Sequence, residues 1–275
     1  MRPRLVFLSA LAAAATATVI GSGLSAAAGG QVRARALPRG VFTVNCRFSH
    51  RNTDDLIVYP GRPGLSHDHT YFANNSTNAF STIDSLKAST TTCNRPADTA
   101  AYWVPTLLVA GQPVEPVAAT IYYRRRTFQR VQPFPVGLKM IAGDSHATAP
   151  QSLRLTNWNC GGQSGVAPSS TVPTCPAGGR TTLRLVVNFA NCWDGTNLDS
   201  ADHKSHMAYS NGRQCPASHP VEVPAISLHV RYPVQGGPAA ELSSVGQFSA
   251  HADFVNSWNQ NRLRRLVNRY LNHRR

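Results

Sequence analysis

Acidic residues are scarce in this sequence. Only 13 Asp and Glu stand against 27 Lys and Arg in 275 residues, which gives a formal net charge of +14. Most glycosidases need two carboxyl groups that face each other across the bond to be cleaved, and several of the few carboxylates here lie beside histidines instead. The composition therefore disfavours two-carboxylate hydrolysis, and the positive charge favours anionic partners.

Several common catalytic motifs are missing as well. The sequence contains no G-x-S-x-G nucleophile turn, no phosphate-binding P-loop and no G-x-G-x-x-G dinucleotide fingerprint. Its cysteines are never spaced C-x-x-C, which disfavours a zinc ribbon. Neither nucleotide chemistry nor a standard esterase mechanism is therefore indicated.

The six cysteines instead suggest an oxidising compartment. An even number of cysteines in an exported chain predicts three disulfides, although six residues allow fifteen connectivities. We expect sequential pairing: Cys46 with Cys93, Cys160 with Cys175, and Cys192 with Cys215. The middle pair is the best supported, because it closes a short Gly-, Ser- and Pro-rich loop at small entropic cost.

The first residues have the pattern of an export signal. A basic start, an apolar stretch and small residues ending at Ala28 predict a signal peptide over 1–28 with cleavage near Gly29. The same stretch is long enough to be an uncleaved anchor, which is the alternative. We expect a secreted, extracellular monomer without stable membrane insertion after cleavage, whose partner is a polysaccharide or another anionic cell-wall polymer and not nucleic acid.

The remaining chain reads as one domain rich in strands. Residues 29–40 form a flexible lead-in, and 41–275 show short apolar runs separated by turn residues, with 19 prolines and 20 glycines in the whole chain. Strands are expected at 41–46, 102–109, 118–124, 183–189 and 225–234, and an amphipathic helix over 254–271. The pattern predicts a mainly β fold: a single disulfide-braced, jelly-roll-like β-sandwich with a C-terminal amphipathic helix.

Histidines supply the strongest functional signal. The ten histidines include three clusters with acidic neighbours: "SHDHTYF" at 66–72, "LDSADHKSHMAY" at 198–209 and "SAHADF" at 249–254. Titratable side chains in such clusters tend to gather at functional sites. We predict that the clusters meet in one pocket and supply the catalytic groups His67, His69, His203, His206, His251, Asp199 and Asp253.

A divalent metal is one interpretation of these clusters. In a strand, residues two apart face the same way, so we predict that His67 and His69 bind a metal together with His206. The metal-free alternative uses one histidine as a general base, oriented by Asp and assisted by Lys204. A third alternative is that the Asp–His clusters only brace loops. The cofactor therefore stays open between a divalent metal and none.

Other residues are candidates for substrate contact. Aromatic rings stack on sugar rings, and cations attract an anionic chain. On these grounds we predict substrate-binding roles for Tyr71, Trp103, Lys204, Arg124 and Arg126, although aromatic residues in a β domain are more often core.

Six segments of the sequence are similar to the secreted domain-of-unknown-function family DUF1996. They are "RNTDDLIVYPGRPGLSHDHTYF", "TTCNRPADTAAYWVPTL", "FANCWDG", "DHKSHMAYS", "CPASHPVEVPAISLHVRY" and "GQFSAHADFVNSWN". The resemblance spans 41–271 and includes Asp55, His67, His69, Asp199, His203, His206, His251 and Asp253. It implies membership of an actinobacterial and fungal family whose fungal members are often joined to WSC modules, which implies polysaccharide surroundings by association.

Three positions depart from the family pattern. Leu56 stands where proline is usual, Ala73 where glycine follows the aromatic pair, and Tyr270 where many bacterial relatives carry cysteine. The resemblance supports a site more than a reaction. Two hypotheses follow: an exported enzyme that cleaves or modifies a polysaccharide by a lyase-like or metal-assisted mechanism, or a non-catalytic glycan- or wall-binding protein.

Overall fold

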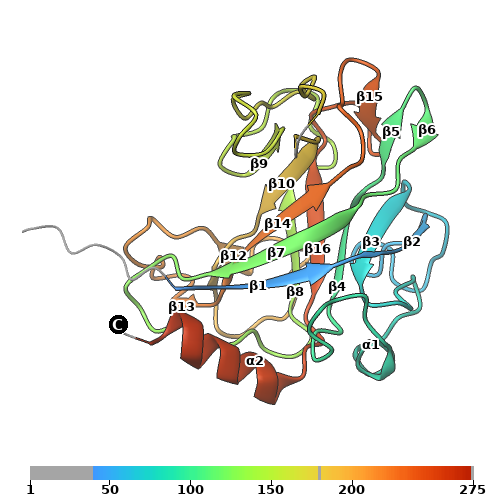
Figure 1. Cartoon of the computed structure of the whole chain (residues 1–275). Coiled ribbons are helices and arrows are strands. Elements are labelled where there is room, and N and C mark those ends of the chain that lie inside the picture. Colours follow the sequence, from blue (N-terminus) through green and yellow to red (C-terminus); the bar gives the residue numbers. More distant parts are fainter. Residues whose placement is uncertain (1–39, 179–180, 274–275) are drawn as a thin grey trace, which may run out of the picture. The chain divides into compact units, whose positions relative to one another are not determined.

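A computed structural model describes residues 40–178 and 181–273 and shows a mainly antiparallel β fold (Figure 1). Sheet A has the strand order β1 (Val41–Cys46), β7 (Ala118–Arg124), β14 (Ala225–Arg231), β10 (Arg184–Asn188) and β9 (Thr156–Asn159). Sheet B has the order β2 (Phe48–Asn52), β3 (His69–Ala73), β4 (Ala101–Pro105), β16 (His251–Val255) and β8 (Lys139–Gly143). The predicted signal, 1–28, and nearly all of the lead-in lie outside the described residues.

One hydrophobic core lies between the two sheets. In β7 every second residue is buried, as expected of a strand with one face on a core. Val44 and Ile121 from sheet A share this core with Tyr102 and Phe254 from sheet B. The arrangement confirms the predicted mainly β, sandwich-like fold; its strand order was not predictable from the sequence.

Sheet B is buried on its second face too. All five residues of each of β3, β4 and β16 are buried. On the face turned away from sheet A, Tyr71 and Trp103 pack with Ile57 from the 53–68 segment and Leu86 from the short helix α1 (Ile83–Ala88). The outer side of sheet B is therefore a second, smaller interior, closed by the segment that precedes β3.

Side chains of Asp54 and Asp55 hold the covering segment in place. The Asp54 carboxylate accepts hydrogen bonds from the backbone N–H of Gly64 at 2.9 Å and of Ala79 at 3.0 Å. Asp55 Oδ1 accepts from the backbone N–H groups of Ile57 at 2.8 Å and Val58 at 2.9 Å. These bonds give partners to backbone donors of a segment that has no strand or helix of its own.

The C-terminal helix is shorter than predicted. Phe254 and Val255 belong to β16, and α2 (Gln260–Leu266) begins only after Asn259, whose side chain accepts a hydrogen bond from Arg262 N. The helix continues as a π-helical turn, η1 (Val267–Leu271). Leu263, Val267 and Leu271 join the main core. The prediction of a helix from Phe254 was wrong because β16 is buried on both faces, and a short apolar run without alternation cannot be told from a helical segment by its period.

Smaller elements complete the fold. β11 (Cys192–Trp193), β12 (Met207–Ala208) and β13 (Val221–Glu222) form one short sheet, and β5 (Leu107–Val109), β6 (Gln112–Pro113) and β15 (Ala240–Leu242) form another. The predicted strand at 102–109 is therefore two strands, β4 and β5, in different sheets. Within 40–178 and 181–273, no helix has the length and apolar character needed to cross a membrane.

Three disulfides join the expected cysteines: Cys46–Cys93, Cys160–Cys175 and Cys192–Cys215. Cys46 ends β1, and Cys93 follows Thr92, whose backbone N–H donates to the carbonyl of Ala73 at the end of β3. This bridge therefore ties an edge strand of sheet A to a segment that lies along sheet B. Ala73 itself has a φ of 67°, a left-handed conformation that suits the glycine expected there from the family pattern.

Candidate functional site

Three histidines converge on the outer side of sheet B. His69 opens β3, and His251 opens β16. Both strands pair with β4, and the β3 register places His69 opposite Pro105. Continuing the β16 register from the Asp253–Trp103 pair puts His251 opposite the same proline, so the two histidines flank β4 in one row. His67 comes from the covering segment just before β3, and not from a strand shared with His69 as predicted.

The three rings are close enough to share one ligand. Their centroids lie 4.2 Å apart for His67 and His69, 5.0 Å for His67 and His251, and 5.8 Å for His69 and His251. One ring nitrogen from each lies within 4.8 Å of those of the other two. This is the spacing expected of three imidazoles around a single cation.

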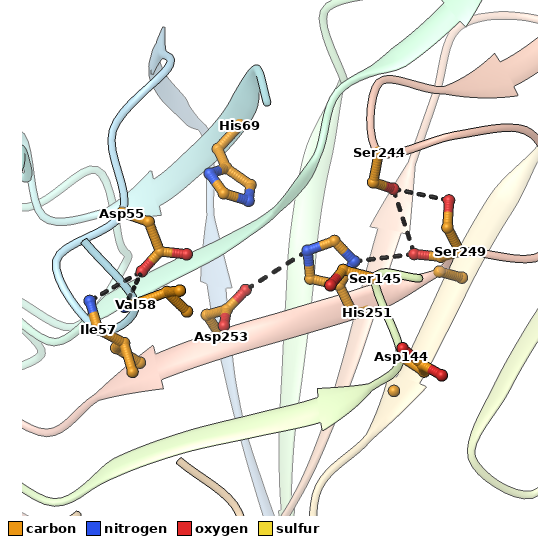
Figure 2. Close-up of polar contacts among 12 residues, drawn as sticks. Asp55, Ile57, Val58, His69, Asp144, Ser145, Ser244, Ser249, His251 and Asp253 are labelled. Carbon is orange, nitrogen blue, oxygen red and sulfur yellow. Dashed lines mark hydrogen bonds and ion pairs between the residues drawn. The ribbon is translucent and has the colours of Figure 1, made fainter. Parts of the chain in front are cut away.

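Backbone carbonyls determine which nitrogen of each buried ring faces the others. His69 Nδ1 lies 3.0 Å from Asp54 O. His251 Nδ1 lies 2.8 Å from Ser249 O (Figure 2). A carbonyl only accepts hydrogen bonds, so Nδ1 carries the proton and Nε2 keeps its lone pair. Metal-binding histidines in proteins are oriented in this way by a partner on the other nitrogen.

Burial keeps all three imidazoles neutral at neutral pH. Burial lowers the pKa of His67 to about 4 and that of His251 to about 3, and it lowers the pKa of His69 well below its usual value. The neighbouring imidazoles add to the depression at His69 and His251. Neutral imidazole is the form that binds a metal.

Two buried carboxyl groups border the histidines. Asp55, His69 and Asp253 also offer three ligand atoms within 4.8 Å of one another. Burial raises the pKa of Asp55, and it raises that of Asp253 well above the usual value. Asp253 Oδ2 lies 3.9 Å from His251 Nε2 (Figure 2), and because burial disfavours charge on both groups, this is a contact between neutral forms and not an ion pair.

Several polar atoms of the cluster have no partner. His67 Nε2, His69 Nε2 and Asp253 Oδ2 are buried and accept or donate no hydrogen bond within the described residues. Unpaired buried polar atoms are costly, and here three of them belong to neighbouring metal-ligand side chains. A divalent cation held by the three imidazoles, with Asp253 or Asp55 beside them, would satisfy these atoms, so the residues present fit a metal.

A cavity of about 260 Å³ gives access to the cluster. His67, His251, Asp55 and Asp253 line its inner side, and Tyr59 and His146 are among the residues nearer the surface. Gly143 lies opposite His251 with a φ of 86°, and a side chain there would collide with the carbonyl of Ala250 and with His251 Cα. Glycine at this position thus allows β8 to approach the histidine strand.

The other predicted catalytic residues form a separate group nearby. His203 Nδ1 lies 2.8 Å from Asp199 Oδ1, and Asp199 Oδ2 lies 3.0 Å from Lys139 Nζ at the start of β8. His206 Nε2 lies 2.7 Å from Lys139 O and its Nδ1 lies 2.8 Å from Ser200 Oγ. His206 is only 1% exposed and uses both ring nitrogens, so the structure places His251, not His206, beside His67 and His69.

The predicted substrate-binding residues lie in different places. Lys204 Nζ donates to Gly143 O at 2.8 Å, and its charge acts on both His251 and Asp253, so it borders the cluster. Tyr71 and Trp103 are fully buried beneath the 53–68 segment, which corrects the expectation that their faces are open to a ligand. Arg124 lies on β7 of sheet A, on the other side of the sandwich, and Arg126 follows that strand.

Sequence reasoning missed some residues of the cavity. Asp55 stands in one of the quoted family segments but is absent from the predicted site residues, because it has no histidine beside it in the sequence. β8 ends at Gly143, and Ser145 and His146, which follow Asp144, both line the cavity. Ser145 and His146 reach the cavity because β8 pairs with β16, and no local sequence pattern indicates this pairing.

Comparisons with known proteins agree with the resemblance seen in the sequence. Residues 55–258 match the family described as "Domain of unknown function (DUF1996)". No curated protein and no solved structure gave a significant match. The matched segment covers most of the chain and contains the three clustered histidines together with Asp55 and Asp253. The chain belongs to the DUF1996 family.

Proposed function

We propose that this domain is an extracellular, metal-dependent enzyme that cleaves or modifies a polysaccharide. The observation that carries the proposal is the convergence of the neutral rings of His67, His69 and His251, with unpartnered Nε2 atoms on the first two. His67 and His251 line a cavity, and His69 lies buried behind them. Three protein ligands with an open position are typical of catalytic metal sites, whereas structural sites are closed.

The imidazole donors limit the metals that suit the site. Imidazole ligands suit zinc, copper, iron and nickel, and hard cations such as Mg²⁺ and Ca²⁺ prefer oxygen ligands. When bound, such a cation would supply a Lewis acid and lower the pKa of a coordinated water. His67 is the half-buried member of the set, so the cation's accessible side would face the cavity.

The carboxyl groups do not form a glycosidase pair. Asp55 and Asp253 are 4% and 1% exposed, and their ligand atoms lie within 4.8 Å of each other and of His69. Both groups lie on the inner side of the cavity against His69, so they do not flank a passage for a sugar chain as two-carboxylate hydrolysis requires. Their place supports roles as a ligand or as an orienting group for the imidazoles. Lys204 at the rim adds positive charge that would stabilise an anionic substrate.

Metal binding is the first test of this proposal. Chelator-treated full-length protein is titrated with Zn²⁺, Cu²⁺, Ni²⁺ and Mn²⁺ by calorimetry, alongside His67→Ala, His251→Ala and His273→Ala. We expect one site per chain, with affinity lowered at least tenfold by the first two changes and unaltered by the last, because His273 is exposed at the end of the described chain. Equal affinity in all four proteins would contradict a site at the cluster.

Turnover is the second test, and it separates an enzyme from a binding protein. Acidic and neutral polysaccharides are screened for new reducing ends, unsaturated ends and mass changes with the metal-loaded protein. The proposal expects turnover that His67→Ala abolishes while the variant still binds the polymer. Binding without turnover in the parent protein would instead support the non-catalytic glycan-binding function.

A further inference from the structure

The outer face of sheet A carries positive charge without any acidic residue. The strand registers give its outward positions, which are Val41, Thr43, Asn45, Ala118, Thr120, Tyr122, Arg124, Ala225, Ser227, His229, Arg231, Arg184, Val186, Asn188, Asn157 and Asn159. Three of these are arginines, and none is Asp or Glu. This face lies across the main core from the histidine cluster, which is on the outer side of sheet B.

Two of the arginines are direct cross-strand neighbours. Arg184 on β10 pairs in register with Arg231 on β14, and like charges in directly opposed positions destabilise a sheet. Neither they nor Arg124 forms an ion pair with any residue of 40–178 or 181–273. Arg184 Nε is in addition buried without a hydrogen-bond partner in that part of the chain. An anion between the two guanidinium groups would remove both costs.

A hollow of about 390 Å³ lies over Arg184 and Arg231. Tyr122 and His229 form its floor with ring centroids 4.7 Å apart, and the Arg124 guanidinium lies 4.5 Å from the Tyr122 ring centre. Burial and the charges of Arg124 and Arg184 lower the pKa of His229 to about 4, so its ring is a neutral, flat surface at neutral pH. Such rings stack against sugar rings.

The neutral side chains around the arginines are amides and hydroxyls. Thr120 donates to Asn45 at 2.9 Å, and Ser227 donates to Asn188 at 2.6 Å. A second hollow of about 540 Å³ begins at Asn188 and Ala225, at the far end of β10 and β14, and includes Arg126 and Arg154. Positive groups therefore occur at both ends of the strands, and hydrogen-bonding side chains lie between these ends. A strand of seven residues spans about 20 Å.

We propose that the outer face of sheet A is a binding surface for a polysaccharide that carries carboxylate groups, separate from the histidine cluster. Guanidinium groups bind carboxylates with two parallel hydrogen bonds. The hydroxyl and amide groups match the hydroxyls of a sugar chain. The His229 ring adds a flat neutral surface, and Tyr122 supports the Arg124 guanidinium that lies over its ring. Three arginines among many neutral polar positions give a lower charge density than a nucleic-acid surface needs. The surface binds whether or not the histidine cluster is catalytic.

The test compares polygalacturonate with its fully methyl-esterified form, which keeps the sugar backbone and loses the charge. Affinities are measured by calorimetry for the full-length protein, for Arg184→Gln/Arg231→Gln, and for Arg262→Gln/Arg264→Gln, which removes the same charge at exposed positions of α2. We expect polygalacturonate to bind at least tenfold more tightly than the ester. The first double change should weaken binding at least tenfold, and the second by less than twofold.

Further variants distinguish this surface from binding at the histidine cavity or at scattered surface charges. Tyr122→Ala should weaken polygalacturonate binding severalfold, whereas His67→Ala should leave it unchanged. Thermal unfolding of each variant shows whether the fold is retained. Equal weakening by both double changes, or loss of binding in His67→Ala, would overturn the proposal. The proposal would also be overturned if polygalacturonate did not bind. A duplex DNA oligonucleotide that bound as tightly, through Arg184 and Arg231, would overturn it as well.

Discussion

Histidines in this domain occupy two kinds of environment. His50 and His206 brace loops: each places both ring nitrogens within hydrogen-bond distance of a partner, such as Thr77 O for His50 at 2.8 Å and Lys139 O for His206 at 2.7 Å. His69 and His251 lie deep in the second interior, but each uses only Nδ1 for a backbone carbonyl. A bracing residue has no reason to leave a buried lone pair unused, and this difference supports a ligand-binding role for the second pair.

Asp253→Asn tests the carboxyl group beside these rings. Because burial keeps the Asp253 carboxyl protonated, a neutral amide of the same shape should leave the stability of the metal-free protein within about 1 kcal/mol. Metal affinity should fall tenfold to a hundredfold, as for other residues that bind or orient ligands. Urea unfolding with chelator and metal titration measure the two effects. Asp98→Asn, at a buried carboxyl in the main core, is the control and should not change metal affinity.

His229 predicts a pH dependence of stability. Its pKa is about 4 in the folded protein, lowered by burial, Arg124 and Arg184, against an ordinary histidine value of 6.5 in the unfolded chain. Between these two pH values the unfolded chain binds a proton at His229 that the folded protein does not bind. His229 therefore lowers the free energy of unfolding as pH falls from 6.5 to 4. The decrease is about 2 kcal/mol when the partial exposure of the ring is allowed for. His229→Gln should lose that part of the decrease. Urea unfolding of both proteins at pH 7 and pH 4.5 measures it, and parallel pH profiles would contradict it.

At the scale of elements, the 53–68 segment acts as a lid that gives sheet B its second interior. It buries Ile57 against Tyr71 and Trp103, supplies Asp55 and His67, and provides the Asp54 carbonyl that orients His69. A loop with so many fixed backbone bonds positions a site as rigidly as a strand does. The loop therefore contributes to the site as much as the strands that carry His69 and His251.

Ile57→Ala measures this contribution. Ile57 is 1% exposed in the cluster beneath the segment, and Val58, its neighbour, is 40% exposed. Truncation of the buried residue should cost about 2–4 kcal/mol of stability, and it should weaken metal binding because the segment carries His67. Val58→Ala should change stability by less than about 0.5 kcal/mol and leave the metal site intact. Urea unfolding and metal titration of the two variants give the comparison; similar effects would show that the segment is not held by packing.

At the scale of the molecule, the sandwich separates two surfaces of different chemistry. The outer side of sheet B is covered by the 53–68 segment except at the cavity, and it contains the neutral imidazoles and carboxyl groups. The outer side of sheet A carries arginines beneath an open hollow. Part of the positive charge behind the net +14 therefore lies on a face that is separate from the neutral histidine cluster. A long polymer could contact the arginine face without entering the histidine cavity.

The disulfides should contribute unequally to whole-molecule stability. Cys46–Cys93 spans 47 residues and ties sheet A to sheet B, whereas Cys160–Cys175 spans 15 residues within one loop. Loop entropy gives about 4 kcal/mol for the first bridge and about 3 kcal/mol for the second. We expect Cys160→Ser/Cys175→Ser to keep full metal affinity and Cys46→Ser/Cys93→Ser to be the less stable variant in urea. The reverse order would show that native-state strain outweighs chain entropy.

Some features followed from local sequence alone. Short apolar runs bounded by turn residues located β1, β7, β10 and β14. Burial alternates in β1 and β7, because a strand with one buried face has a period of two. The central strand β16 was misassigned, since a strand buried on both faces has no such alternation. The disulfide pairing followed from cysteine order and loop length.

The sequence by itself determined the fold class, the family and the histidines worth examining, because composition, periodicity and motif order are carried by neighbouring residues. Only the tertiary structure decided that His251 and not His206 joins His67 and His69, that Tyr71 and Trp103 are sealed, and that Arg124 faces away from the cavity. Those outcomes depend on strand register and sheet order. Register and order are set by contacts between segments far apart along the chain, and no local pattern records them.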